Sequence, residues 1–291
     1  MNKYTLSVLG GGFCWGFIGL FSRHLAEFGI DSTGVVIIRC AISAICFGLL
    51  IIFTDYRQFI IKFKDIWCFL GSGLLSLLFF TFCYFNAINM MSLSAAAILL
   101  YTAPTIVMIL SAILFKERIT KSKLLSVVMA FLGCCLVSGI AGGVSLSLQG
   151  LLFGLGSGLG YALYTIFSRY ALLRGYSSNT INFYSCFLAA LGTVIIWGEH
   201  GTLTAMSATA SSLVWSVGIG VFCCFVPYLL YTYGLIGLEN GKASVLASVE
   251  PVVASLLGIV IYHEKMSLLS FLGVVFVLGA VVNLNIVKVE K

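Results

Sequence analysis

Long apolar runs separated by short polar connections make up most of the chain. Ten such runs can be drawn, and each is close to the roughly 20 residues that a helix needs to cross a hydrocarbon core of about 30 Å. They cover residues 5–22, 32–54, 66–88, 94–115, 122–140, 150–170, 179–198, 211–236, 242–262 and 267–287. The pattern therefore predicts an all-α polytopic membrane protein with ten transmembrane helices in a lipid bilayer.

Composition supports this prediction. Of the 291 residues, 60% are hydrophobic and 9% are charged, whereas soluble domains carry about 25% charged residues. The first run follows Lys3 as in a signal peptide, but Phe21-Ser22-Arg23 offers no small-residue cleavage site. We therefore assign the first run to a transmembrane helix and exclude a water-soluble fold.

The basic residues indicate how the chain is oriented. With the amino terminus inside, 13 of the 16 Lys and Arg residues fall on the cytoplasmic side, and the exceptions are Arg23, Arg39 and Lys265. Such a bias predicts that both termini are cytoplasmic. It also accounts for the net charge of +6 without a nucleic-acid partner. We expect a multi-pass protein of the cytoplasmic (inner) membrane of a prokaryote.

The two halves of the chain share residues at matching spacings. Pro104 precedes Glu117 by 13 positions, Pro251 precedes Glu264 by 13 positions, and the two segments superpose at an offset of 147. Further matches are Tyr84 with Tyr231 at the same offset, and Phe21-Ser22-Arg23 with Phe167-Ser168-Arg169 at an offset of 146. These matches predict two five-helix repeats, at residues 1–143 and 148–291.

Five is an odd number of helices, so the second repeat enters the membrane in the opposite sense to the first. The charges agree, because basic positions on the cytoplasmic side of the first repeat are mostly uncharged in the second. The corresponding sets are Lys116, Arg118, Lys121, Lys123 and His263, Lys265, Leu268, Ser270. Inverted repeats are common in secondary transporters, where the substrate binds between the halves and the halves rock to give alternating access.

Several of these residues resemble those of a known family. The chain resembles the drug/metabolite transporter superfamily, and specifically its EamA-type members with two repeats. The resemblance rests on Pro104 with Lys116-Glu117-Arg118, on Glu250-Pro251 with Glu264, and on Arg39. It implies a central cavity lined mainly by helices 1, 3, 4, 6, 8 and 9. It also implies export of an amino acid or a related amphipathic metabolite, either coupled to protons or running down a gradient.

Glu250 is the one acidic residue expected well inside a span. The ninth helix starts near Lys242, so a rise of about 1.5 Å per residue puts Glu250 about 12 Å deep. A desolvated carboxyl there can take up a proton or hold a substrate ammonium group. Alternatively, it bonds the backbone that Pro251 frees, or pairs with a buried arginine. Its counterpart in the first repeat is Ala103, so the halves differ chemically at this position.

Arg39 is the one basic residue expected well inside a span, about 10 Å below the outer end of the second helix. Its planar set of donors suits a substrate carboxylate. The simpler interpretation, which we adopt at this point, makes Arg39 a buried charge partner of Glu250 or of backbone carbonyls.

All three prolines fall inside spans. Pro104 frees the carbonyl of Leu100, Pro251 frees that of Ala247, and Pro227 frees that of Cys223. Such breaks are tolerated where neighbouring groups or a water-filled cavity satisfy the backbone. We interpret Pro104, Pro227 and Pro251 as hinge or kink positions, with Pro104 and Pro251 either facing the cavity or serving packing.

The remaining candidates for substrate binding are polar-aromatic and amide side chains on the helices expected to line the cavity. Together with Glu250, they are Trp15, Tyr84, Asn86, Tyr101, Tyr161 and Tyr231. As a set they suit a small molecule with an apolar body and a few polar atoms.

The sequence lacks the residue patterns that metal binding, nucleotide binding and catalysis need. The ten cysteines form no CxxC pair and no zinc-like spacing with His, so no metal site and no cofactor are expected. The series Gly154, Gly156, Gly158 and Gly160 lacks the spacing of a nucleotide loop and suits close helix packing. No set of acid, base and metal ligands converges, so we do not expect an enzyme.

Alternatives remain open within the transport class. A flippase of a lipid or lipid-linked sugar would need a lipid-facing polar groove, and an uptake permease would use the same architecture in the opposite direction. The oligomeric state, monomer or homodimer, is also open.

Overall fold

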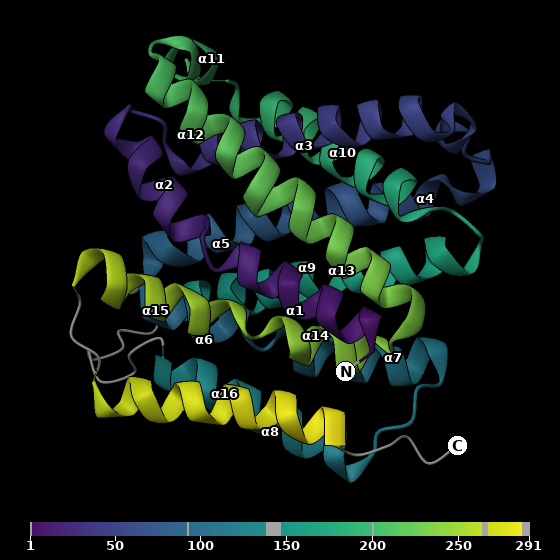
Figure 1. The fold of residues 1–291 in the computed structure, drawn as a ribbon, viewed down its shortest axis with the longest axis vertical. Helices are drawn as coiled ribbons and strands as arrows, with labels where there is room; N and C mark the ends of the chain where they lie inside the picture. Colours follow the sequence, from purple (N-terminus) through teal and green to yellow (C-terminus); the bar gives the residue numbers. More distant parts are fainter. Residues whose placement is uncertain (1, 92, 138–146, 200, 264–266, 287–291) are drawn as a thin grey trace.

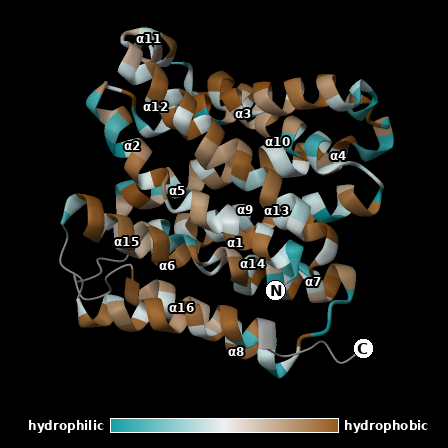
Figure 2. Cartoon of the chain, viewed as in Figure 1, coloured by the Kyte–Doolittle hydropathy of each residue, from teal (hydrophilic) through white to brown (hydrophobic). Residues whose placement is uncertain are grey.

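The computed structural model describes residues 2–91, 93–137, 147–199, 201–263 and 267–286. Glu264 and Lys265 of the repeat motif, and most of the predicted seam between residues 143 and 148, lie outside these ranges. The helices pack side by side in a layered bundle, with α8 and α16 forming one outer layer (Figure 1). Figure 2 shows hydrophobic residues along the helices and many of the hydrophilic ones near their ends.

The helices follow the predicted runs. In the first half they are α1 (Lys3–Trp15), α2 (Ile18–Glu27), α3 (Ser32–Thr54), α4 (Ile66–Leu70), α5 (Phe79–Met90), α6 (Leu93–Leu100), α7 (Ala103–Phe115) and α8 (Lys121–Val137). In the second half they are α9 (Leu148–Leu173), α10 (Ser178–Trp197), α11 (Thr202–Ser207), α12 (Ala210–Gly220), α13 (Val226–Gly237), α14 (Asn240–Ala247), α15 (Glu250–Tyr262) and α16 (Leu268–Ile286). π-Helical turns at Gly71–Leu78 and Val221–Phe225 join α4 to α5 and α12 to α13.

Several spans consist of two consecutive helices, as with α1 and α2 or α14 and α15. Counted in this way, eight segments of the described chain are long and apolar enough to cross a membrane. α8 and α16 are shorter in their described, apolar part and complete the ten. The prediction of an all-α, multi-span membrane protein is confirmed.

The two halves share unusual backbone features at one offset. α6 and α7 are separated at Tyr101-Thr102, and α14 and α15 are separated at Ser248-Val249, 147 positions later. Lys116 (φ 56°) and His263 (φ 53°), again 147 apart, are the non-glycine residues of the described chain with positive φ. A left-handed residue ends a helix by redirecting the chain. The sequence repeat is thus also a repeat of local conformation.

Equivalent helices of the two halves pack antiparallel. Gly133 of α8 faces Gly273 of α16 near one end of the pair. At the other end, the Asn283 amide donates to the hydroxyls of Ser122 (3.1 Å) and Ser126 (2.8 Å). α8 and α16 hold the same place in their repeats, so their opposite directions are those of an inverted pair.

The start of α1 and the end of α16 lie at one end of the bundle. Tyr4, near the start of α1, packs on Gly237 at the end of α13. Glu239, two residues later, forms an ion pair with Lys123 at the start of α8. Ser122, next to Lys123, contacts Asn283 near the end of α16. We call this end of the bundle the Lys123 end, and it is the end that the charge pattern predicts to be cytoplasmic.

The helix breaks at Pro104 and Pro251 divide their spans into half-helices, because each proline stands in the first turn of the second half. A Cβ at Gly158 would lie 3.4 Å from the carbonyl oxygen of Leu100, and one at Gly12 would lie 3.0 Å from that of Ala247. The freed carbonyls therefore pack against glycines of neighbouring helices. Pro227 follows the π-helical turn in the span of α12 and α13.

The crossing of α8 and α16 gives a stability prediction. A Cβ at Gly273 would lie 2.6 Å from the Gly133 carbonyl oxygen and 2.8 Å from the Val137 nitrogen, and overpacking of this kind costs about 1–3 kcal/mol. We expect Gly273→Ala to lower the unfolding temperature of the detergent-solubilised protein. Gly19→Ala is the matched control, because nothing lies within 4 Å of its Cβ. Equal unfolding temperatures for the two variants would contradict the tight crossing.

Candidate functional site

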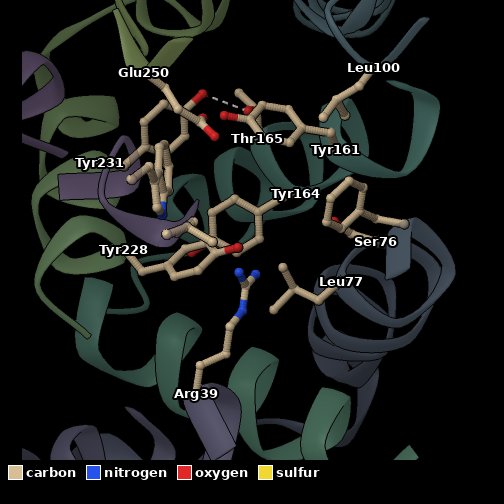
Figure 3. Close-up of a pocket in the computed structure, with 13 residues that line it drawn as sticks. Arg39, Ser76, Leu77, Leu100, Tyr161, Tyr164, Thr165, Tyr228, Tyr231 and Glu250 are labelled. Carbon is tan, nitrogen blue, oxygen red and sulfur yellow. Dashed lines mark hydrogen bonds between the residues drawn. The ribbon is translucent and has the colours of Figure 1, made fainter. Parts of the chain in front are cut away.

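A pocket lies where the two repeats meet, and its walls come from both (Figure 3). The first half contributes Trp15, Ile18, Arg39, Ser76, Leu77, Phe80 and Leu100, and the second half contributes Tyr161, Tyr164, Thr165, Tyr228, Tyr231 and Glu250. These residues belong to spans 1, 3, 4, 6, 8 and 9, the set that the resemblance implies, with Arg39 added from span 2. The cavity volume is about 60 Å³, room for a few water molecules. A molecule much larger than water would therefore fit only if the walls moved apart.

Glu250 enters the pocket because of the helix break beside it. It is the first residue of α15, directly after the turn at Ser248-Val249 and before Pro251. In the described part of the chain, its carboxylate has no cation within 4.0 Å and no hydrogen-bond donor. The carboxylate is therefore available to a proton or to a bound cation.

Arg39 reaches the pocket from the side opposite Glu250 (Figure 3). Its Nε atom is enclosed and has no hydrogen-bond partner. No ion pair within 4.0 Å joins it to a carboxylate of the described chain, Glu250 included. The two charged groups thus share one pocket without direct contact.

Aromatic rings form the wall between these charges. Trp15 lies edge-on to Tyr228 and tilted against Tyr231, with ring centroids 5.4 Å apart in both pairs. Tyr164 contacts Tyr228 at 4.8 Å, and Tyr161 lies 6.3 Å from Trp15. Such rings offer apolar faces to a ligand while their hydroxyls remain polar.

Hydrogen bonds fix the rings on the side of the pocket toward the Lys123 end. The hydroxyls of Thr165 and Tyr231 lie 2.7 Å apart, joining α9 to α13. The Tyr164 hydroxyl donates to the Asn182 carboxamide oxygen, which also accepts from Thr232 (3.0 Å). These bonds cross between spans, so the rings cannot turn independently.

At the Lys123 end, a set of polar contacts ties the first repeat and α9 to the start of α14. The Glu117 carboxylate accepts the backbone N–H groups of Asn240 (2.8 Å) and Gly241 (3.3 Å). A carboxylate suits this place because the first N–H groups of a helix lack intrahelical partners and carry partial positive charge. The Arg169 guanidinium, from α9, donates to the Asn240 side chain (2.7 Å) and to the Leu238 carbonyl.

The Lys123–Glu239 ion pair adds a further link at the same place. We call this set of residues the latch; its members are Glu117, Lys123, Arg169, Leu238, Glu239, Asn240 and Gly241. The latch holds α14 against α7, and these two helices pack closely. The repeat counterpart of Glu117 is Glu264, which lies outside the described residues.

The structure gathers some of the sequence-predicted residues and leaves others apart. Trp15, Tyr161, Tyr231 and Glu250 line the pocket. Tyr84 stacks on Phe80 at 5.7 Å, Tyr101 packs with Cys134 and Val252, and Asn86 donates to the Phe82 carbonyl of its own helix (2.8 Å). The last three are not among the lining residues, although Tyr84 stacks on the lining residue Phe80.

Sequence reasoning missed other members of the pocket. Ser76, Leu77 and Phe80 lie in apolar runs, where nothing distinguishes them from packing residues. Thr165 stands one helical turn before Arg169, and nothing in the sequence marks it as a pocket residue. No metal-binding group of three His, Cys, Asp or Glu residues occurs in the described chain, where the ten cysteines are free.

Comparisons with known proteins agree with this architecture. The model of the EamA-like transporter family matches residues 2–139 and again residues 148–286. An uncharacterized transporter of Archaeoglobus fulgidus is 32% identical over 201 residues, which is 68% of this chain and 69% of that protein. A second one from the same organism is 26% identical over 260 residues, 89% of this chain and 90% of that protein.

A solved crystal structure has a similar fold. It superposes with a TM-score of 0.81, at 16% sequence identity, over 96% of this chain and 95% of the other. At this identity the likeness concerns the fold alone.

Proposed function

Because the chain belongs to the EamA-like transporter family, we propose that it exports a small amphipathic metabolite, an amino acid or a related compound, by alternating access. The observation that carries this proposal is the pocket between the repeats, where one arginine and one carboxylate stand among aromatic side chains. Carriers built from inverted repeats bind their substrates at such a junction. The chain is a multi-pass membrane transporter, and we do not assign it an enzymatic reaction.

The predicted orientation assigns the latch to one side of the membrane. The positive-inside bias supports a cytoplasmic location for the Lys123 end. The latch then closes the cytoplasmic side of the pocket, and the substrate is loaded from the cytoplasm only after α14 separates from α7. Rocking of the repeats would break the latch on one side while the opposite side closes.

Proton coupling is the second part of the proposal, with Glu250 as the group that carries the proton. The carboxylate is unpaired in the described structure and lies beside a helix break. Burial favours its neutral form, whereas a cationic substrate group favours the charged form. A proton and a substrate ammonium group would thus compete for the same carboxylate, which is a simple basis for exchange. The proposed hinges are Pro104 and Pro251, which stand in the first turns of α7 and α15.

The two alternative transport functions, a flippase and an uptake permease, have less support. A groove between α3 and α10 is lined by apolar residues such as Ile45, Phe183 and Phe187. Such a lining offers no polar group to a lipid headgroup, so a flippase finds no site there. An uptake permease would share the pocket and differ in the direction of flux.

A two-step experiment tests the proposal. The purified protein is first screened by thermal shift against amino acids, amines, nucleosides and carboxylates. Compounds that stabilise it are then loaded into proteoliposomes. We expect at least one of them to be released with saturable kinetics, and protein-free liposomes are the control. If no stabilising compound is released faster than from protein-free liposomes, the transport proposal fails.

A further inference from the structure

Arg39 lines the pocket although its span is not among those expected to line it. It belongs to α3, in the second span, whereas the resemblance implies a cavity lined by spans 1, 3, 4, 6, 8 and 9. Nevertheless its guanidinium extends into the pocket (Figure 3). It is also the one basic residue among the lining side chains.

The protein gives this buried charge little compensation. Nε is enclosed and unpartnered, no described carboxylate lies within 4.0 Å, and no described ring stacks on the guanidinium. The polar groups that interact most strongly with it are the thiols of Cys40 and Cys224 and the phenol of Tyr228, and the Glu250 carboxylate interacts with it only from across the pocket. A charge inside a membrane protein is costly without a partner and marks a functional position when none is built in.

We propose that Arg39 binds a carboxylate group of the transported molecule. This inference rests on the proposed function and adds the substrate class: a small monocarboxylate, either a simple anion or a zwitterion. A guanidinium matches a carboxylate with two parallel hydrogen bonds, which are strengthened by charge.

The pocket limits the charge that such a substrate carries. Arg39 provides one positive charge, and Glu250 stands in the same pocket on the opposite side. A second anionic group, or a phosphate dianion, would face the Glu250 carboxylate without a cation to balance it. An ammonium group, by contrast, would be attracted to Glu250, and an apolar body would lie against Trp15 and Tyr228. The arrangement therefore favours a single carboxylate with an apolar or cationic remainder.

Acids and their corresponding amides test the carboxylate site on the wild-type protein. Thermal-shift titrations compare a panel of the natural amino acids and small aliphatic and aromatic carboxylic acids with the corresponding amides. We expect at least one acid to bind and its amide to bind at least about tenfold more weakly, because a hydrogen-bonded ion pair is lost. A panel in which no acid binds, or in which the amide binds as well as its acid, would overturn the assignment.

Variants give an independent measurement. For the acid that binds, Arg39→Gln should raise the Kd at least about tenfold, and Arg39→Lys should raise it less because the charge is kept. Arg57→Gln, at an exposed position, should leave the Kd unchanged. If Arg39→Gln does not fold, Arg39→Lys and the acid-to-amide comparison decide the question.

The Arg39 carboxylate site and the transport function can each be refuted without refuting the other. Saturable release of a neutral or purely cationic metabolite, unaffected by Arg39→Lys, would refute the carboxylate site and leave the transport function standing. If a carboxylate binds in a way that depends on Arg39 but no saturable flux is found, the carboxylate site is supported and the transport function is refuted.

Discussion

Replacing Glu250 with glutamine is expected to abolish the response of transport to a pH gradient. Glutamine keeps the size and hydrogen-bonding capacity of the side chain but cannot take up a proton. For one proton per substrate, a gradient of one pH unit drives up to about a tenfold concentration ratio. We therefore expect the wild type to build up a ratio of this order in proteoliposomes, and Glu250→Gln to show equal substrate concentrations on both sides.

The control is Glu27→Gln, which removes a carboxylate from an exposed position at the end of α2. It should retain the full response to the gradient. If Glu250→Gln responds to the gradient as the wild type does, the proton is carried elsewhere and the coupling role of Glu250 is refuted.

Breaking the latch should free the start of α14. In Glu117→Ala, the N–H groups of Asn240 and Gly241 lose the carboxylate that accepts them, at a cost of about 1–3 kcal/mol. The closed arrangement at the Lys123 end should then lose about one to two orders of magnitude in population relative to the open one. Hydrogen–deuterium exchange of a peptide covering α14 should accelerate by at least about tenfold.

Glu117→Gln is the matched variant, because its amide oxygen can still accept one of these bonds. It should accelerate exchange less than Glu117→Ala does. Unchanged exchange in α14 for both variants, with the protein folded, would mean that the latch does not control opening at this end.

The number and limits of the spans could be predicted from sequence because one physical constraint sets them. A helix in hydrocarbon must be apolar over a fixed length, and the ten runs map onto the observed helices within a few residues. The repeat was equally visible, since the Pro104 and Pro251 segments keep their spacing. Their equal backbone breaks follow from the same local sequence.

The identity of the pocket residues was harder to predict because hydropathy does not fix how a helix is rotated. Tyr84 and Tyr231 occupy equivalent positions in the two repeats. Tyr231 lines the pocket and forms a hydrogen bond with Thr165, whereas Tyr84 stacks on the lining residue Phe80 and is not itself among the lining residues. The same residue type at the same repeat position thus has two environments, which depend on the neighbouring helices.

The latch was beyond sequence reasoning for a different reason. Glu117 belongs to the repeated motif, but nothing in the sequence links it to Asn240, which is 123 positions away. Its role depends on the helix break that exposes the start of α14, and on how close the repeats bring the two segments. Arg39 was recognised as unusual, but only the three-dimensional arrangement separates it from Glu250.

Substrate counterflow tests the central claim most directly, namely that the pocket serves a carrier with alternating access. Proteoliposomes loaded with an unlabelled compound from the stabilising set are diluted into a trace of the labelled compound, without a pH gradient. A carrier that exchanges one molecule for another takes up label transiently above its equilibrium level, and we expect this overshoot to disappear in protein-free liposomes. Uptake that rises only to equilibrium, at the same rate in loaded and empty proteoliposomes, would contradict alternating access.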